Sequence, residues 1–136
     1  MEETVVMAIK KTLLEAEIND AFIKFQRSLI GRGPTEAKTY IIDDMVLIRL
    51  KGVLTIEETH LVKTEKGRQI VKQMRQILRE TFSEDAENLV ARLTGCRVVS
   101  SHSDISTKTG ERVEIYILDT NLEKQLRDEE KTKVDT

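Results

Sequence analysis

Ile30-Gly31-Arg32-Gly33-Pro34-Thr35 separates a stretch with a helical pattern from one with a strand pattern, and this boundary decides the fold. Before it, apolar residues recur at steps of three, four or seven, which places them along one face of a helix. These residues are Met7, Leu14, Ile18, Phe22, Phe25 and Leu29. Gly31 and Gly33 are typical of a helix end, and Pro34 prevents the helix from resuming at once. The pattern leaves open whether residues 4–30 form one helix or two.

After the boundary the apolar residues follow a period of two, which is typical of β-strands. The residues that fall on one face of two successive strands are Thr39, Ile41, Val46, Ile48 and Leu50. Asp43-Asp44 lies between the strands and predicts a tight turn, because aspartate tolerates the left-handed backbone conformation better than most residues. We therefore predict a β-hairpin with one buried face.

A second unit of helix and hairpin follows. Thr55-Ile56-Glu57-Glu58 has the spacing of a capping box and predicts the start of a short helix. A longer helical pattern then carries Ile70, Met74, Ile77, Leu78, Phe82, Leu89 and Leu93. Ser83, followed by two acidic residues, predicts a kink in this helix, and Gly95 predicts its end. In the second hairpin the apolar residues Val113, Ile115 and Ile117 alternate with Arg112, Glu114 and Tyr116.

The elements follow the order αββαββ, which predicts an α+β fold. The simplest packing is a two-layer sandwich, with a four-stranded antiparallel sheet that carries the helices on one face. At 136 residues the chain is expected to form one domain, over residues 1–120. Residues 121–136 are predicted to be a charged C-terminal tail, although Leu118, Leu122 and Leu126 repeat every four residues. Beyond Arg127 almost every residue is polar, so that end is expected to fray.

Composition excludes several classes of function. The formal net charge of −2 gives no global attraction to nucleic acid or anionic lipid. The longest apolar run is Met45-Val46-Leu47-Ile48, far shorter than the roughly 20 residues of a membrane-spanning helix. The acidic start of the chain is unlike a signal peptide, so a cytoplasmic location is expected. A single cysteine, Cys96, is too few for a cysteine-based metal cage, and no cofactor is expected.

No group of residues has the spacing of a catalytic site, and we predict that the protein is not an enzyme. Ser100-Ser101-His102-Ser103-Asp104 contains the residue types of a hydrolase triad, but triad members converge from separate segments. Asp43 and Asp44 are expected to point apart at a hairpin tip. His60 and His102 are far apart in the sequence and have no metal-binding spacing.

Two features are candidates for binding a partner. The first is the loop Gly31, Arg32, Gly33 and Pro34, which is similar to the start of the nucleic-acid-clamping loop of KH domains but has proline at the fourth position. Its alternative interpretation is a plain helix stop, which leaves only Arg32 unexplained. The second is a basic stripe whose members Lys72, Arg75 and Arg79 share a helical face. Its alternative interpretation is a solvated helix face balanced by acidic residues.

The Gly31–Pro34 loop, together with Gly52-Val53-Leu54-Thr55 and Leu93-Thr94-Gly95, resembles the MpsC-like family. Members are named after one component of a sodium-translocating, membrane-potential-generating system, and the resemblance runs from about Ile18 to Leu118. It implies a small accessory or regulatory subunit of a membrane system for ion or inorganic-carbon uptake. Such a subunit would dock to a larger membrane-associated protein, peripheral at the inner face of the membrane.

The residues themselves add two expectations about partners. Apolar helices and open sheet edges favour a homodimer. An alternative function is a small nucleic-acid-binding module that uses the Gly31–Pro34 loop and the basic helix face. Binding through that face, to a membrane partner or to nucleic acid, is expected to weaken as salt rises.

Overall fold

A computed structural model describes the backbone of residues 2–135 and the side chains of residues 10–128. The first element is a single helix, α1 (Glu2–Ile30), which settles the choice between one helix and two. The helix ends as the glycine predicts. Gly31 adopts a left-handed φ of +88° and donates its N–H to the Arg27 carbonyl at 2.8 Å.

The predicted first hairpin is confirmed. Strands β1 (Glu36–Ile42) and β2 (Met45–Lys51) pair in antiparallel fashion, and Asp43 takes the left-handed φ of +52° that the turn requires. The five residues assigned to the inner face are all buried. The alternation of the sequence was therefore sufficient to place this hairpin in the correct orientation.

Three helices follow, and the predicted capping box and the predicted glycine end are both confirmed. Helix α2 (Ile56–Leu61) begins with a complete capping box between Thr55 and Glu58. Helix α3 (Glu65–Thr81) has Thr64 as its N-cap, and α4 (Ser83–Thr94) begins where the kink was predicted. Ser83 does not cap α4: the N-cap position is Phe82, without a side-chain cap hydrogen bond, and the Ser83 hydroxyl donates to the Glu80 carbonyl instead. Gly95 ends α4 with a φ of +70°.

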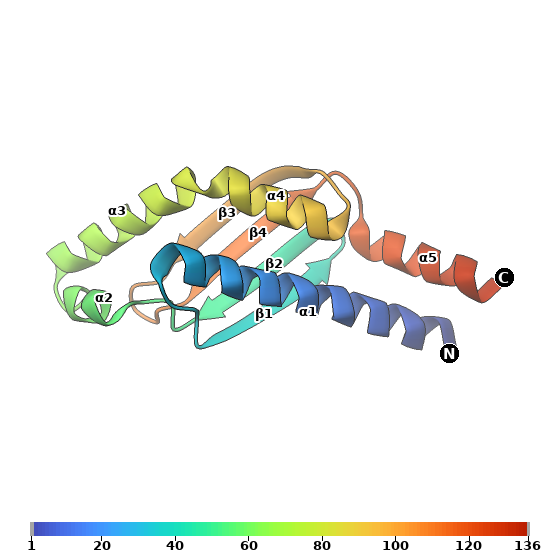
Figure 1. Cartoon of the computed structure of the whole chain (residues 1–136), viewed down its shortest axis with the longest axis horizontal. Helices are drawn as coiled ribbons and strands as arrows, with labels where there is room; N and C mark the ends of the chain where they lie inside the picture. The colour runs from blue at the N-terminus through green and yellow to red at the C-terminus, as the bar shows by residue number, and fades with distance from the viewer. Residues whose placement is uncertain (1, 136) are drawn as a thin grey trace.

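Strands β3 (Val98–Ile105) and β4 (Arg112–Leu118) complete an antiparallel sheet whose order is β1-β2-β4-β3. Figure 1 shows α1, α3 and α4 on one side of this sheet, with α2 and α5 near its two ends. The α+β class, the four-stranded antiparallel sheet and the helical layer are as predicted. Strands β1 and β3 are the two edges.

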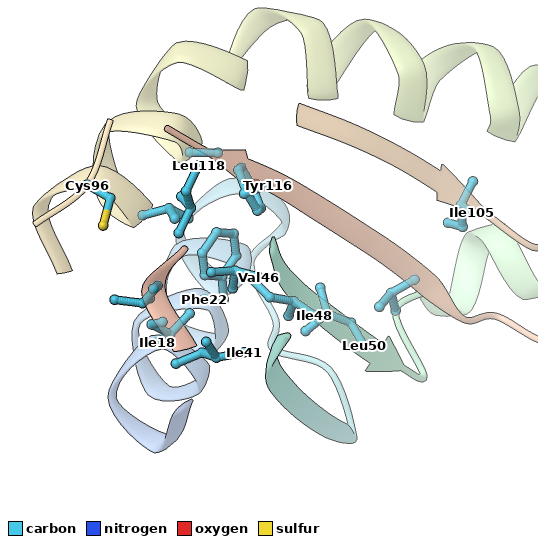
Figure 2. Close-up of a cluster of buried hydrophobic side chains, with 14 of the residues drawn as sticks. Ile18, Phe22, Ile41, Val46, Ile48, Leu50, Cys96, Ile105, Tyr116 and Leu118 are labelled. Carbon is cyan, nitrogen blue, oxygen red and sulfur yellow. The ribbon is translucent and has the colours of Figure 1, made fainter. Parts of the chain in front are cut away.

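The core lies between α1, α4 and the inner face of the sheet (Figure 2). Phe22 of α1 packs against Tyr116 of β4, with ring centroids 5.6 Å apart. Ile18, Val46 and Ile48 surround this pair and are fully buried. Burial of aliphatic and aromatic side chains at this interface is the main force that holds α1 on the sheet.

The last helix, α5 (Leu122–Asp135), starts inside the region that the sequence assigned to a tail. Leu122 and Leu126 are buried in the core, and α5 packs beside α1. An ion pair between Lys11 and Glu123 joins the two helices. The spacing of four residues between Leu118, Leu122 and Leu126 was thus the signal that indicated a packed helix here. The side chains beyond Asp128, on which the prediction of fraying falls, lie outside the described residues.

Candidate functional site

The Gly31–Pro34 loop lies against the connection between β2 and α2. The guanidinium of Arg32 donates to the Leu54 carbonyl at 3.0 Å and to the Gly52 carbonyl at 3.4 Å. Arg32 is half-buried, so part of its side chain still faces solvent. The loop therefore does more than end a helix: it ties α1 to the segment that leads into α2. Partner recognition by the loop stays a prediction.

This crossing of two loops requires glycine at position 52. Gly52 has a φ of +64°, and a Cβ atom there would lie only 2.2 Å from the Thr35 hydroxyl oxygen. The Thr35 amide donates to the Lys51 carbonyl at 2.9 Å, which fixes the approach. Gly33 is held less tightly, because its nearest neighbour, the Arg27 guanidinium, would lie 3.4 Å from an added Cβ.

Arg75 is not on a solvated face, and that alternative for the basic stripe is wrong for this residue. Arg75 is 2% exposed. Its Nε donates to Glu58 Oε2 at 2.8 Å, and its Nη2 donates to Glu58 Oε1 and to the Val53 carbonyl. Burial alone would raise the pKa of the Glu58 carboxyl, but hydrogen bonds from Arg75 and the Thr55 amide hold that pKa below its ordinary value. The pair locks α3 to α2 and to the end of β2.

Arg79, one turn later, is also turned inward. Its Nε donates to Glu114 Oε1 at 2.7 Å, and its guanidinium lies over the Tyr116 ring at 5.8 Å from the centroid. The Tyr116 hydroxyl donates to the same Glu114 oxygen at 2.9 Å. Burial, followed by the negative charge of Glu114, raises the pKa of the Tyr116 phenol, so this hydroxyl stays protonated. Of the three predicted stripe residues, only Lys72 is exposed.

The second hairpin explains why these charges are inside. Arg112, Glu114 and Tyr116 face the helices and are buried, whereas Val113, Ile115 and Ile117 face away and are half-exposed. Along β4, therefore, the polar residues of the alternating pattern face the helices and the apolar ones face away. The sequence analysis did not identify Glu58, Glu114 and Arg112 as site residues. For Arg112 and Glu114, the available signal was their position on the same face of the strand as Tyr116.

The inward face of α3, the start of α4 and the edge of the sheet line an open cleft of about 620 Å³. Its lining includes Lys72 and Arg79 from α3, Ser101 and Ser103 from β3, and Arg112 from β4. Lys72, Arg75 and Arg79 of the predicted site thus come together at this cleft. The Gly31–Pro34 loop does not reach it; Arg32 lines a separate shallow depression with Gly52 and Leu54.

The other side of α3 is apolar and faces solvent. Ile70, Met74 and Ile77 are 46%, 42% and 56% exposed, although the same helix buries Val71 and Arg75. Their spacing of four and three residues puts them on one ridge, which we call the α3 ridge. This ridge and the cleft lie on opposite sides of one helix.

Within residues 10–128, no group of histidine, cysteine and acidic side chains is arranged to hold a metal ion. His102 and Ser100 of the triad-like stretch sit on the outer sheet face, opposite Ile115 and Ile117 of β4. Cys96 is buried and lies 3.6 Å from the Thr94 carbonyl oxygen. In the part of the chain that the structure covers, no helix is both long and apolar enough to cross a membrane.

Comparison with known proteins gives one family. The family described as the Na+-translocating membrane potential-generating system (MpsC) matches residues 10–120. Protein YbcI of Bacillus subtilis (strain 168) is 36% identical over 120 residues, which cover 88% of this chain and 97% of the relative. YrhF of the same strain is 26% identical over 110 residues, covering 80% and 90%. Both names carry the word "uncharacterized". No solved structure matches the chain.

Proposed function

Because the chain belongs to the MpsC family, we propose that it is a non-catalytic accessory or regulatory subunit of a sodium-translocating membrane system. In this proposal the subunit stays peripheral to the membrane and docks to a larger, membrane-associated protein of that system. The observation that carries the docking step is the α3 ridge, formed by Ile70, Met74 and Ile77.

An exposed apolar ridge on an otherwise polar helix is typical of an interaction surface. Helix α3 buries Val71 and Arg75 but leaves three large apolar side chains exposed, whereas a surface helix usually turns its apolar side chains toward the core. Full burial of one such side chain contributes about 1.5–3 kcal/mol, so covering the three of them would favour association substantially.

The expected occupant is an apolar groove or helix of the membrane-associated protein, with a rim that carries acidic groups. Lys66 is exposed one helical turn before Ile70 and complements such a rim. Arg75 and Arg79 are occupied by Glu58 and Glu114, so the charge available for docking is smaller than the sequence suggested. We therefore expect salt to weaken docking only modestly.

The test compares two exposed-residue variants in cells. Ile70→Ser/Ile77→Ser removes most of the ridge, and Leu13→Ser, which changes a 65% exposed leucine on α1, is the matched control. We expect the parent and the control to co-purify with the membrane subunits of the sodium-translocating system. The amount of the ridge variant recovered with those subunits should be at least tenfold lower. Each protein is also compared in membranes from cells that lack those subunits.

Two outcomes would contradict the proposal. Equal recovery of the ridge variant and the control would remove the α3 ridge as the docking surface. Recovery from membranes that does not depend on the transporter subunits, together with flotation on protein-free liposomes, would assign the ridge to lipid instead.

The outer face of the sheet supports a second contact, between two copies of this chain. Tyr40 pairs with Leu47, and Leu47 pairs with Ile115, which makes an apolar row across three strands. All three side chains are half-exposed, and Ile42 beside them is 40% exposed. A symmetric pair of such faces around a twofold axis would cover the row on both copies.

Nucleic-acid binding draws less support. Two of the three cations of the basic helix face, Arg75 and Arg79, are turned inward and paired with carboxylates. Arg32 donates its hydrogen bonds to carbonyl groups of its own chain. The aromatic residues Phe22 and Tyr116 pack in the core and are not available to stack on bases.

A further inference from the structure

The cleft between α3 and the β3–β4 edge contains a buried donor without an acceptor. Arg112 is 6% exposed, and its Nη1 donates to the Ser103 hydroxyl at 3.2 Å. Its Nε, also buried, has no hydrogen-bond partner among the described residues. Buried polar groups are nearly always satisfied, and leaving one unsatisfied costs about 1–3 kcal/mol. Arg112 is one of the residues that line the cleft, so a ligand held there would lie beside its guanidinium.

The buried charges around this donor do not balance. Three buried or nearly buried guanidinium groups, those of Arg75, Arg79 and Arg112, face two carboxylates, Glu58 and Glu114. Glu58 is bound by Arg75, and one oxygen of Glu114 is shared by Arg79 and Tyr116. Burial, opposed by Glu114 and reinforced by the charges of Arg75 and Arg79, lowers the pKa of the Arg112 guanidinium. Among the described residues, Arg75 and Arg79 each hold a carboxylate, whereas the structure gives Arg112 only a hydroxyl partner; an added anion beside Arg112 would supply the missing acceptor.

We propose that this cleft is a binding site for a small molecule that carries a carboxylate, with Arg112 as its main anchor. The side-on edge of a guanidinium, which includes Nε–H, matches the two oxygens of a carboxylate. Ser101 and Ser103 line the same cleft with hydroxyl groups, and Lys72 lies at its exposed margin. Its volume of about 620 Å³ falls within the range of small-molecule sites, roughly 300–1,000 Å³.

A carboxylate fits better than a phosphate because acidic groups also line the cleft. Glu80, Glu87 and Asp104 are part of the lining. Glu87 accepts a hydrogen bond from Ser101 at 2.8 Å, and Asp104 accepts one from the Ile105 amide. A dianionic phosphate would be repelled by these carboxylates, whereas a single planar negative charge is compensated by Arg112. The same acidic groups could accept hydrogen bonds from donors elsewhere on the ligand.

The site goes beyond the docking proposal and is independent of the α3 ridge, which faces the other way. Loss of the ridge should leave carboxylate binding intact, and loss of Arg112 should leave the exposed ridge intact. The two proposals can therefore fail separately.

The experiment titrates the full chain with three monocarboxylates (acetate, lactate and benzoate) at constant ionic strength, with inorganic phosphate and chloride as comparison ions. Two signals are followed: the melting temperature and the ¹H–¹⁵N resonance of the Arg112 Nε–H group. We expect at least one carboxylate to raise the melting temperature in a saturable way and to shift the Arg112 resonance with the same midpoint. Phosphate should shift that resonance at least tenfold more weakly.

Variants identify the anchor. Arg112→Lys keeps the charge and removes the Nε–H group, and Ser103→Ala removes the hydroxyl that accepts the hydrogen bond from Nη1. Arg92→Met, which changes an exposed arginine on α4 outside the cleft, is the control. We expect Arg112→Lys to lose at least tenfold in affinity, Ser103→Ala to lose less, and Arg92→Met to bind like the parent.

Three results would overturn the proposal. One is the absence of a saturable shift of the Arg112 resonance with all three carboxylates, which would mean that water satisfies the donor. Another is an equal response to chloride at matched ionic strength. The third is a saturable rise in melting temperature without a shift of the Arg112 resonance, which would place the ligand elsewhere. If Arg112→Lys fails to fold, the Arg112 resonance of the unaltered chain still decides the question.

Discussion

Arg75 shows at the scale of one residue how a side chain taken for surface charge can be structural. Its guanidinium is satisfied by both oxygens of Glu58 and by the Val53 carbonyl, and it is almost fully covered. Such a pair contributes little compared with an apolar replacement of both partners, because both charges lose their hydration. Its effect becomes large when one partner is removed.

We therefore expect Arg75→Met to lower the free energy of unfolding by about 3–5 kcal/mol, since Glu58 would remain buried and charged without its partner. Lys72→Met, which changes an exposed neighbour, should stay within about 0.5 kcal/mol of the parent. Urea unfolding measures both. The double variant Arg75→Met/Glu58→Leu should recover much of the loss. If Arg75→Met were as stable as the control, the pair would not bear on stability.

Glu58 also gives stability a defined dependence on pH. Its pKa in the folded chain lies below the ordinary value of 4.5, so the folded state holds the proton less tightly than the unfolded state. The resulting stabilisation is fully present above the unfolded pKa and is lost as the pH falls through the folded pKa. The free energy of unfolding should therefore decrease as the pH is lowered below about 5.

Glu58→Gln should flatten this acid slope, measured by urea unfolding from pH 7 to pH 3. It should not abolish the slope, because the pKa of Glu123 is also lowered, chiefly by its hydrogen bond from Lys11. A slope that is identical in the parent and in Glu58→Gln would show that other carboxyl groups carry the whole effect.

At the scale of elements, α3 has two faces with different roles. Val71 is fully buried on one face, while Ile77 is 56% exposed on the other. The helix is held by Val71, by the inward arginines and by its cap at Thr64, whereas the ridge residues stay largely exposed. Stability and docking should therefore respond to different residues of the same helix.

Val71→Ala should lower the free energy of unfolding by about 1–3 kcal/mol, because it removes buried methyl groups and leaves a cavity. Ile77→Ala should change it by less than about 0.5 kcal/mol, as expected for an exposed position. Thermal and urea unfolding of the two single variants provide the comparison. A large loss from Ile77→Ala would mean that the ridge is packed within the subunit, which would also weaken it as a docking surface.

At the scale of the whole molecule, the two layers leave the outer face of the sheet uncovered by the described helices (Figure 1). Half-exposed Leu47 and Ile115 lie side by side at the middle of this face. In the proposed homodimer, a second copy covers them. Two subunits paired in this way would present two α3 ridges, one on each distal side of the assembly.

Light scattering on the purified chain should then give about twice its mass of 15.6 kDa. Leu47→Lys should shift the particle to the single-chain mass, because a charge would be buried in the centre of the contact. Ile77→Ser, on the opposite side of the subunit, should leave the dimer intact. A single-chain mass for the unaltered protein over a wide concentration range would remove the dimer; dissociation by Ile77→Ser alone would move it to α3.

The sequence predicted most of the fold because local signals and tertiary packing agree. Gly31 and Gly95 are positions where the chain must adopt a positive φ, Thr55 and Glu58 complete a capping box, and β1 and β2 alternate cleanly. Each of these signals acts over a few residues. The element order, the hairpins and the helix boundaries could therefore be found without knowing which surfaces meet.

The candidate site was harder to predict, because charge in a sequence does not say which way it points. Lys72, Arg75 and Arg79 share a helical face, but whether that face meets water or the sheet depends on Glu58 and Glu114, which lie 17 and 35 residues from their partners. Arg112 is a similar case: its strand alternates apolar and polar residues, and either face could have been the inner one.

By itself, the sequence of this protein determined the class of fold, the places where helices begin and end, and the family to which the chain belongs, because short-range backbone preferences and motif spacing fix these. Only the tertiary structure decided that the polar face of β4 and the arginines of α3 are inside while Ile70, Met74 and Ile77 are outside. The physical reason is that a buried charge is stable only beside a partner of opposite charge, and here the partners come from distant segments brought together by the sheet.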